Sequence, residues 1–281
     1  MAFVAVDGVN LFYEEAGSGH PLLFLHEFGG DARTWEQQVR YFSRRYRCIV
    51  TAARGYPPSD VPDDENAYGW QQNIADAVAV LDHLGIARAH VIGLSMGAYI
   101  GLQMSLRHAD RLSALVAASG GSGAHPPTRD QFISDTLAGA ERMLASGAVP
   151  ADELAHNPSR IQLKDKDPRG WQEFRDQLAE HPATGSAYTF RRVQAARPGL
   201  HDFAPGLAAS TVPTLLMVGD EDEACLDVNL WLKRTMPMAG LTVFPKAGHL
   251  INLEEPARFN AQCADFLIAA EKQQWKARNS V

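Results

Sequence analysis

The chain has 281 residues, of which 46% are hydrophobic and 21% are charged, and its formal net charge is −7. This size allows one large domain, or a core with an insertion, around a sizeable apolar interior. No apolar run approaches the roughly 18 residues that a membrane-spanning helix needs, and an acidic chain without blocks of Lys or Arg lacks the surface that binds nucleic-acid phosphates. We therefore expect no membrane and no nucleic acid as partner, but a small-molecule substrate, neutral or cationic.

Two further features of the composition concern location and redox state. Residues 1–7 contain neither a basic leader nor a long apolar segment, which favours a cytoplasmic protein. Cys48, Cys225 and Cys263 are widely spaced and form no CxxC pair. We expect buried free thiols rather than a disulfide framework or a zinc site.

Strand and helix patterns alternate along most of the chain. Two short β-like runs at residues 3–6 and 10–14 are joined through Asp7-Gly8, which is typical of a hairpin. Apolar runs typical of strands buried on both faces follow at residues 21–26, 47–52, 90–92, 112–118, 214–218 and 241–244. Helical periods occur at residues 34–43, 68–84, 96–108 and 256–270. The alternation predicts an α/β fold with a mostly parallel, doubly wound sheet.

The alternation breaks after the glycine-rich residues 119–123 and resumes near Thr211. Helical periods without strand signals lie between them, at residues 130–146, 151–161, 170–181 and 186–196, and we interpret 164–169 as a solvated loop. We expect a helical cap inserted after strand 6. The predicted domains are a core formed by residues 1–121 and 207–281, and a cap formed by residues 122–206.

The segment Gly93-Leu94-Ser95-Met96-Gly97 places a serine between a predicted strand and a predicted helix. Glycines two residues before and after Ser95 allow the tight turn that leaves its oxygen exposed above the sheet edge. A serine nucleophile needs a base, which works best when a carboxylate orients it. Asp222 and His249 follow the next two predicted strands in the required order, with Asp220 as the alternative acid.

An oxyanion hole is expected beside this serine. The segment His26-Glu27-Phe28-Gly29-Gly30-Asp31 closes the third predicted strand, where a loop can turn a backbone N–H toward the nucleophile. The N–H of Phe28 and the N–H of Met96 are the predicted donors. We expect the His26 ring to hydrogen-bond loop backbone.

In these features the sequence resembles the α/β-hydrolase family, in particular its cap-bearing esterases, lactonases and C–C hydrolases. The resemblance covers essentially the whole length and rests on five segments in the family's order, at residues 26–31, 53–60, 93–97, 219–222 and 248–249. It implies Ser95 as nucleophile, His249 as base and Asp222 as acid, because Asp222 matches the family's third position after the glycine. It implies no metal and no organic cofactor.

Glu27 departs from the family pattern, since many relatives carry glycine there. We expect its carboxylate to point outward, because an inward charge would need a buried partner. The residues predicted for the substrate pocket are Glu27, His125, Trp171, Tyr188 and Leu250. Packing inside the cap is the competing interpretation for the aromatic residues of the insertion.

The sequence predicts a serine hydrolase that cleaves a small, largely apolar carboxylic ester or lactone through an acyl-enzyme. The alternative is a C–C bond hydrolase of ring-cleavage products, which needs a basic pocket residue such as Arg191 or Arg192. A cofactor-free oxygenase and a non-catalytic ligand receptor are more distant alternatives. The oligomeric state, monomer or homodimer, stays open.

Overall fold

In the computed structural model, which describes residues 2–278, eight strands form one sheet in the order β1-β2-β4-β3-β5-β6-β7-β8. The strands are β1 (Ala2–Val6), β2 (Val9–Ala16), β3 (His20–Leu25), β4 (Tyr46–Thr51), β5 (Ala89–Leu94), β6 (Leu112–Ala118), β7 (Thr214–Gly219) and β8 (Ala239–Phe244). β2 is antiparallel to β1 and to β4, whereas all other neighbours are parallel. The predicted α/β class and mostly parallel sheet are confirmed.

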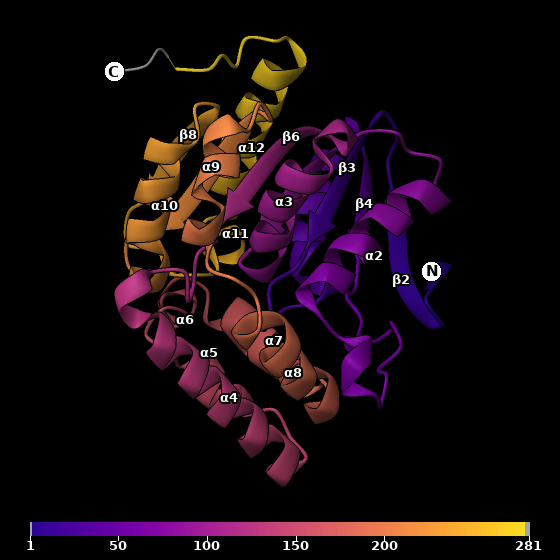
Figure 1. Cartoon of the computed structure of the whole chain (residues 1–281), viewed down its shortest axis with the longest axis vertical. Helices are drawn as coiled ribbons and strands as arrows, with labels where there is room; N and C mark the ends of the chain where they lie inside the picture. The colour runs from indigo at the N-terminus through magenta and orange to yellow at the C-terminus, as the bar shows by residue number, and fades with distance from the viewer. Residues whose placement is uncertain (1, 279–281) are drawn as a thin grey trace.

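Helices cover both faces of this sheet (Figure 1). α1 (Glu36–Phe42) and α12 (Pro256–Glu271) pack against each other, as do α2 (Trp70–His83) and α3 (Met96–Arg107), while α10 (Glu223–Thr235) packs on β7 and β8. Short helices complete the core: η1 (Ala32–Trp35), η2 (Glu65–Ala67), η3 (Ala109–Arg111) and α11 (Ile251–Glu254). Since helices cover both faces, every residue of β5 and β7 is buried, as their apolar sequences require.

The segment between β6 and β7 is helical and contains no strand. Its elements are η4 (Pro126–Thr128), α4 (Arg129–Ser146), α5 (Ala151–Ala155), α6 (Ile161–Lys166), α7 (Pro168–Ala179), α8 (Ala183–Thr189), the π-helix η5 (Phe190–Ala195), η6 (Leu200–Phe203) and α9 (Ala204–Ala209). Helices α4 to α8 lie together at one end of the sheet, whereas α9 packs against α10 (Figure 1). The predicted boundary at residue 206 therefore falls inside α9, and the domain limits stay predictions.

Two local expectations in this segment are wrong. Residues 151–161 do not form one helix, because Pro158 stands between α5 and α6 and cannot donate a backbone hydrogen bond. Residues 164–166 are not a loop but the end of α6, where the Lys166 ammonium lies 2.7 Å from Glu255 Oε1 of the core. A charged run that looks solvated in the sequence is thus partly a contact between cap and core.

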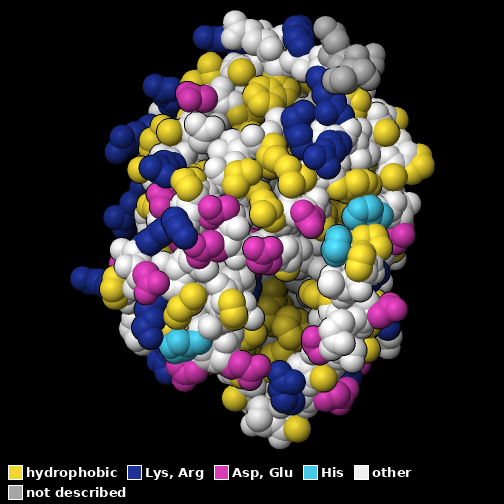
Figure 2. Space-filling view, turned by 90° about the vertical axis from the view of Figure 1, so that its left-hand side faces the viewer, with side chains coloured by type: hydrophobic (Ala, Val, Ile, Leu, Met, Phe, Trp, Pro, Cys, Tyr) yellow, Lys and Arg dark blue, Asp and Glu magenta, His cyan; other side chains and the backbone are white. Residues whose placement is uncertain are grey.

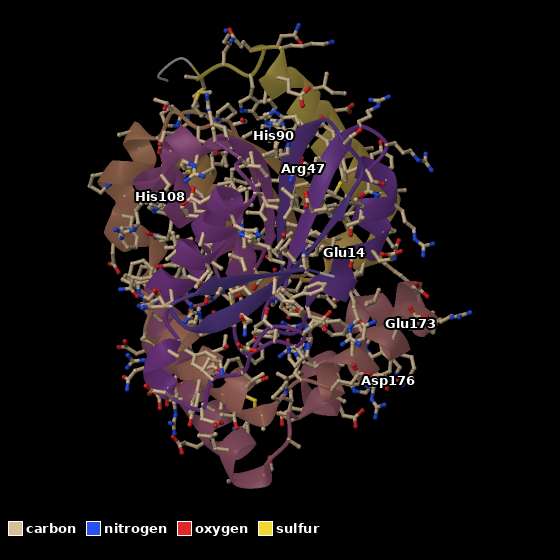
Figure 3. The ribbon with its side chains drawn as sticks, turned by 90° about the vertical axis from the view of Figure 1, so that its right-hand side faces the viewer. Glu14, Arg47, His90, His108, Glu173 and Asp176 are labelled. Atoms are coloured by element: carbon tan, nitrogen blue, oxygen red, sulfur yellow. The ribbon has the colours of Figure 1, made fainter. Side chains whose placement is uncertain are left out.

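The end of the sheet with the cap differs from the opposite end. Figure 3 shows Glu173 and Asp176 on cap helix α7 at one end and His90, near the start of β5, toward the other. Cys48, Cys225 and Cys263 are buried free thiols, as expected. None of the helices formed by residues 2–278 has the length and hydrophobicity to span a lipid bilayer.

Candidate active site

Ser95 occupies a strained turn between β5 and α3. Its φ and ψ are 53° and −104°, and its N–H donates to the Ala118 carbonyl at 2.8 Å. A Cβ on Gly93 would overlap the backbone of Gly97, and one on Gly97 would overlap the Leu25 carbonyl. The two glycines are therefore needed for this turn. The Ser95 side chain does not cap α3, which leaves its hydroxyl available for chemistry.

Asp222 and His249 form a buried hydrogen-bonded pair beyond the ends of β7 and β8. His249 Nδ1 lies 2.7 Å from Asp222 Oδ2, and the two residues are 4% and 1% exposed. An ionised carboxylate can only accept, so Nδ1 carries the proton and Nε2 is left as the basic nitrogen. The alternative acid, Asp220, instead accepts from the Ala247 N–H through Oδ1 at 3.3 Å. The structure thus pairs His249 with the predicted acid.

The loop that carries His249 is fixed through three successive N–H groups. Those of Gly248 and Leu250 donate to the two oxygens of Glu254, at 2.8 and 3.1 Å. The N–H of His249 donates to the carbonyl of Ser159 in the cap, at 2.6 Å. Burial raises the pKa of Glu254, and the N–H of Gly248 opposes that rise. Glu254 was not among the residues predicted from sequence, and a carboxylate shortly after the Gly-His pair is the signal that points to it.

The turn at residues 53–60 forms hydrogen bonds with the loop that carries Phe28. The Phe28 carbonyl accepts from the Tyr56 hydroxyl at 3.0 Å. His26 Nδ1 donates to the Glu27 carbonyl at 2.7 Å, and His26 Nε2 accepts from the Ala53 N–H at 3.0 Å, as expected for a ring that bonds loop backbone. Burial lowers the pKa of His26, which keeps the ring neutral in these two roles. Three hydrogen bonds thus hold the conformation of this loop.

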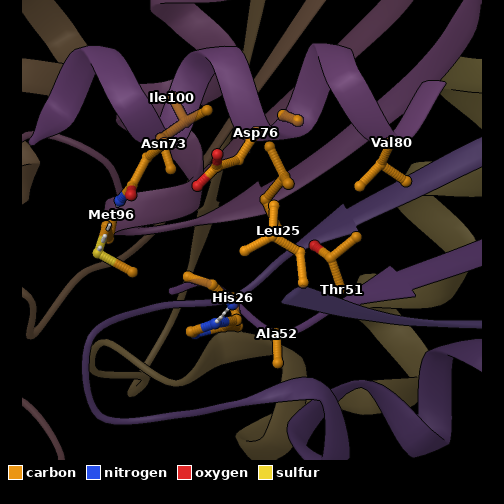
Figure 4. A pocket seen from close by; sticks show the side chains of 12 residues that line it. Leu25, His26, Thr51, Ala52, Asn73, Asp76, Val80, Met96 and Ile100 are labelled. Carbon is orange, nitrogen blue, oxygen red and sulfur yellow. Dashed lines mark hydrogen bonds between the residues drawn. The ribbon is translucent and has the colours of Figure 1, made fainter. Parts of the chain in front are cut away.

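A small cavity lies behind the other predicted oxyanion residue, Met96. Its volume is about 30 Å³, and its walls include Leu25, His26 and Asn73 (Figure 4). The Asn73 Nδ2 lies 4.0 Å from the Met96 sulfur. In the described part of the chain, the N–H groups of Phe28 and Met96 have no protein acceptor. Their role as oxyanion donors stays a prediction.

Glu27 points inward, so the expected outward orientation is wrong. The residue is 1% exposed, and its Oε2 lies 2.7 Å from Arg160 Nη2 of the cap and 3.9 Å from His249 Nε2. Burial alone would raise the pKa of Glu27. The positive charge of Arg160, together with His249, outweighs burial, so the pKa of Glu27 is lowered. The inward carboxylate is tolerated because the cap supplies the buried partner that such a charge needs.

Ser95, Asp222 and His249 all line one cavity, whose volume is about 320 Å³. Its apolar walls come from Phe28, Phe132, Leu154, Leu178 and Phe190. Figure 2 shows one side of the molecule hollowed near its middle, with hydrophobic side chains inside the hollow and acidic side chains around its edge. The cavity lies where the cap meets the carboxyl ends of the strands, which is the usual ligand position in open α/β sheets.

The five residues predicted for the pocket do not line this cavity. Trp171 is buried in the cap, where its Nε1 donates to the Ala155 carbonyl at 3.0 Å, and the ring of Tyr188 packs edge-on against that of Tyr68. Leu250 is 1% exposed, Glu27 is covered by Arg160, and the half-buried His125 precedes η4. Packing within and under the cap accounts for Trp171, Tyr188, Leu250 and Glu27. Sequence spacing could not distinguish such packing from exposure to the cavity.

A metal does not fit the donor set of Asp222, Cys225 and His249. Ligand atoms of Asp222, Cys225 and His249 lie within 4.8 Å of one another. However, burial raises the pKa of the Cys225 thiol well above its ordinary value, and the metal-binding form of cysteine is the thiolate. The Asp222 and His249 atoms that face each other already share a hydrogen bond. The arrangement favours proton transfer over metal binding.

Comparison with known proteins decides the family. Residues 22–262 match the model of the alpha/beta hydrolase family. The chain belongs to this family. It is 28% identical over 279 residues to the 2-hydroxy-6-oxononadienedioate/2-hydroxy-6-oxononatrienedioate hydrolase of Paraburkholderia xenovorans, with 92% of this chain and 91% of that protein covered. It is 27% identical over 241 residues to 3-oxoadipate enol-lactonase 1 of Acinetobacter baylyi, with 85% of each covered.

Among solved structures, the thermophilic esterase from Thermogutta terrifontis superposes with a TM-score of 0.84 at 25% identity, covering 95% of this chain and 97% of that one. All three relatives are hydrolytic enzymes, and the chain is accordingly a hydrolase of small molecules. The bond that it cleaves is not set by membership of the family, because one fold hosts several chemistries.

Proposed function

We propose that the protein is a serine hydrolase that cleaves a small, largely apolar carboxylic ester or lactone through an acyl-enzyme intermediate. The observation that carries this proposal is the shared cavity, which is lined by Ser95 on its strained turn and by the hydrogen-bonded Asp222–His249 pair. We further propose that the protein acts in the cytoplasm and needs no metal or organic cofactor.

In the first half of the reaction, Ser95 Oγ attacks the carbonyl carbon while its proton passes to His249 Nε2. The carbonyl oxygen becomes an oxyanion, which accepts hydrogen bonds from the N–H groups of Phe28 and Met96. The bond to the leaving oxygen then breaks, and that oxygen takes the proton from His249 Nε2. Asp222 holds the Nδ1–H tautomer throughout and stabilises the imidazolium that forms.

In the second half, a water molecule attacks the acyl-Ser95 carbonyl and gives one proton to His249 Nε2. The bond between the acyl carbon and Ser95 Oγ breaks, and the proton returns to Oγ, so the carboxylic acid leaves and the free enzyme is regenerated. The apolar walls and the volume of about 320 Å³ support a small acyl group rather than a long lipid. The lactonase and esterase relatives support an ester or lactone bond.

The test is steady-state hydrolysis of p-nitrophenyl acetate, butyrate and octanoate by the wild type and by Ser95→Ala, together with intact mass after a fluorophosphonate probe. We expect Ser95-dependent turnover, fastest for the shorter chains, and one covalent adduct on the wild type alone. Unchanged turnover by Ser95→Ala, after controls for contaminating esterases, would overturn the proposal.

A second candidate is C–C bond hydrolysis, which the relative from Paraburkholderia xenovorans favours. The basic residues predicted for this reaction do not support it. Arg191 forms ion pairs with Glu65 and Glu141, and neither Arg191 nor Arg192 lines the cavity. Loss of the absorbance of a coloured dienol substrate, faster than ester turnover, would favour this candidate.

A further inference from the structure

The cap side of the cavity carries two polar side chains without a protein partner. Thr136 of α4 and Gln194 of η5 both line the cavity, and they are 6% and 5% exposed. Within residues 2–278, neither the Thr136 hydroxyl nor the Gln194 amide hydrogen-bonds to another protein group. The polar atoms of Thr136 and Gln194 keep some solvent exposure, so both groups are open to the cavity. A ligand that fills the cavity takes them out of water, and it must hydrogen-bond to them or leave them unpaired at a cost in free energy.

The local backbone explains how these side chains come to share a wall. Helix α8 continues into the π-helix η5, whose wider turn is a feature often found at functional sites. At the start of η5, the Phe190 ring stacks on Phe28 of the oxyanion loop, with ring centroids 4.0 Å apart. Gly139 lets α4 approach, since a Cβ there would lie 3.0 Å from the Phe190 ring. The same π-helix thus touches the oxyanion loop at one end and presents Gln194 near the other.

The charges around the cavity indicate what kind of group these side chains receive. Each charged side chain that lines it, among the described residues, already has a polar partner. Arg160 pairs with Glu27 at 2.7 Å, Arg142 with Glu153 at 3.2 Å, Asp222 with His249, and Asp135 accepts from Gln131. With these partners included, the wall holds two arginines against four carboxylates, so it offers a substrate carboxylate no excess of positive charge. A plain alkyl chain would leave the hydroxyl and the amide unpaired.

We infer that Thr136 and Gln194 form a subsite for an uncharged hydrogen-bonding group of the substrate, such as an amide, ketone or hydroxyl, separate from the bond that is cleaved. A glutamine amide offers both a donor and an acceptor, and a threonine hydroxyl offers both as well, so together they match a neutral amide. This inference rests on the proposed function, because it adds a specificity element to the same hydrolytic site.

The experiment compares esters of equal shape. On the acyl side, the p-nitrophenyl ester of N-acetyl-β-alanine is set against that of 5-methylhexanoic acid, with mono-p-nitrophenyl glutarate as the anionic analogue. On the alcohol side, 2-acetamidoethyl butyrate is set against 4-methylpentyl butyrate. We expect the wild type to prefer the amide in at least one pair by about tenfold or more in kcat/KM, and the glutarate to be the poorest acyl substrate.

Two variants of nearly conserved shape, Thr136→Val and Gln194→Met, test the residues themselves. Each should lower the amide-to-alkyl ratio of kcat/KM, and the double variant should bring it close to one. The matched control is Gln172→Met, an exposed glutamine on α7 whose amide bonds Asp176, and its ratio should equal that of the wild type. An unchanged amide-to-alkyl ratio in the double variant, or a preference for the glutarate, would overturn the inference.

Labelling of Ser95 separates this outcome from a failure of the proposed function. If Ser95 is labelled and all the esters react, either result overturns the subsite alone. If neither labelling nor turnover is seen, the hydrolase mechanism itself is contradicted.

Discussion

At the scale of single residues, the buried Glu27–Arg160 pair distinguishes this site from one with glycine beside the oxyanion-loop histidine. Glu27 stands next to the Phe28 N–H, where an unpaired negative charge would repel a developing oxyanion. Arg160 lies 2.7 Å away and is 13% exposed in its side chain. The opposite charges of Glu27 and Arg160 therefore nearly cancel. This cancellation requires the cap to be in place, because Arg160 belongs to the cap.

Arg160→Met tests this pairing. The substitution leaves Glu27 buried without its cation, and losing one partner of a buried pair costs about 3 kcal/mol or more of unfolding free energy. We expect Glu27→Gln/Arg160→Met to recover most of that loss, because it removes both charges. Urea unfolding at pH 7 measures both variants. A double variant that is less stable than Arg160→Met would contradict the explanation.

The pH dependence of the single variant follows from the same pair. In the wild type the pKa of Glu27 is lowered, so its contribution to stability is present above the ordinary carboxyl pKa and is lost as pH falls. Without Arg160, burial dominates and raises that pKa. The loss of stability in Arg160→Met should therefore increase as pH rises above the ordinary carboxyl value, and a loss that is constant from pH 5 to pH 8 would contradict this.

Asp222 and Asp220 offer a matched pair for the acid of the proposed triad. Asp222→Asn keeps the shape but presents an amide that can donate to His249 Nδ1, which favours the wrong tautomer, and kcat should fall by about 10⁴. Asp220→Asn alters only the 3.3 Å contact with the Ala247 N–H, and most activity should remain. Ester turnover measures both. A larger loss of kcat in Asp220→Asn than in Asp222→Asn would indicate that Asp220, and not Asp222, is the acid of the triad.

The predicted triad residues could be located from sequence because each follows a strand end at a motif of fixed local geometry. The orientation of Glu27 could not, since Arg160 lies 133 positions further along the chain. Trp171 and Tyr188 failed as pocket residues for a similar reason. Their spacing gives a helix face, but whether that face meets a cavity or a neighbouring helix depends on how the cap folds.

At the scale of elements, the β5–α3 turn depends on close backbone approach. Gly97 lies in a helix, where alanine is ordinarily favoured, but its added Cβ would overlap the Leu25 carbonyl of β3. Gly97→Ala should therefore cost about 3 kcal/mol or more. Gly85→Ala is the control, since Gly85 has a φ of 65° and nothing within 4 Å of a Cβ, and it should cost about 1 kcal/mol. Thermal and urea unfolding compare them, and equal losses would contradict the role of the close contact.

The elements that sequence pattern located well are the long periodic ones, such as α3 and α12, and the apolar central strands. The elements it missed depend on breaks or tertiary contacts. α5 and α6 are separated around Pro158, and the π-helix η5 has no signature that distinguishes it from an α-helical period. The side chains of η5 that line the same cavity as Ser95 could therefore not be selected from spacing alone.

At the scale of the whole molecule, contacts between cap and core converge on the loops that carry Glu27 and His249. Ser159 and Arg160 of the cap bind the backbone of His249 and the side chain of Glu27, and Lys166 pairs with Glu255. A second group of contacts holds the cap from another direction, where His181 Nε2 lies 3.2 Å from Asp31 Oδ2. Because the cap contacts both Glu27 and His249, the position of the cap and the geometry of the candidate site are coupled.

At the opposite end of the sheet, His90 makes the free energy of unfolding depend on pH in a different way (Figure 3). Burial and the neighbouring His20 lower the pKa of His90, and the Glu271 carboxylate, 3.0 Å from its Nε2, opposes them only in part. Arg88 adds to the lowering, while the Tyr46 ring packs edge-on at 5.9 Å. The folded protein therefore holds this ring neutral at a pH where the unfolded chain already binds a proton.

The sign of the effect follows from that difference. Below the ordinary histidine pKa of 6.5 the unfolded state binds more protons, so the free energy of unfolding falls as pH falls, by about 1.4 kcal/mol for each unit by which the pKa is lowered. His90→Gln should remove this component and flatten the fall between pH 7 and pH 4.5, whereas His83→Gln, at an exposed position on α2, should leave it unchanged. Urea unfolding across that range measures both slopes. Since His90 lies far from the cap, ester turnover by His90→Gln at pH 7 should match the wild type, and a flattened stability curve with unaltered turnover would separate the stability of the sheet from the chemistry at its other end.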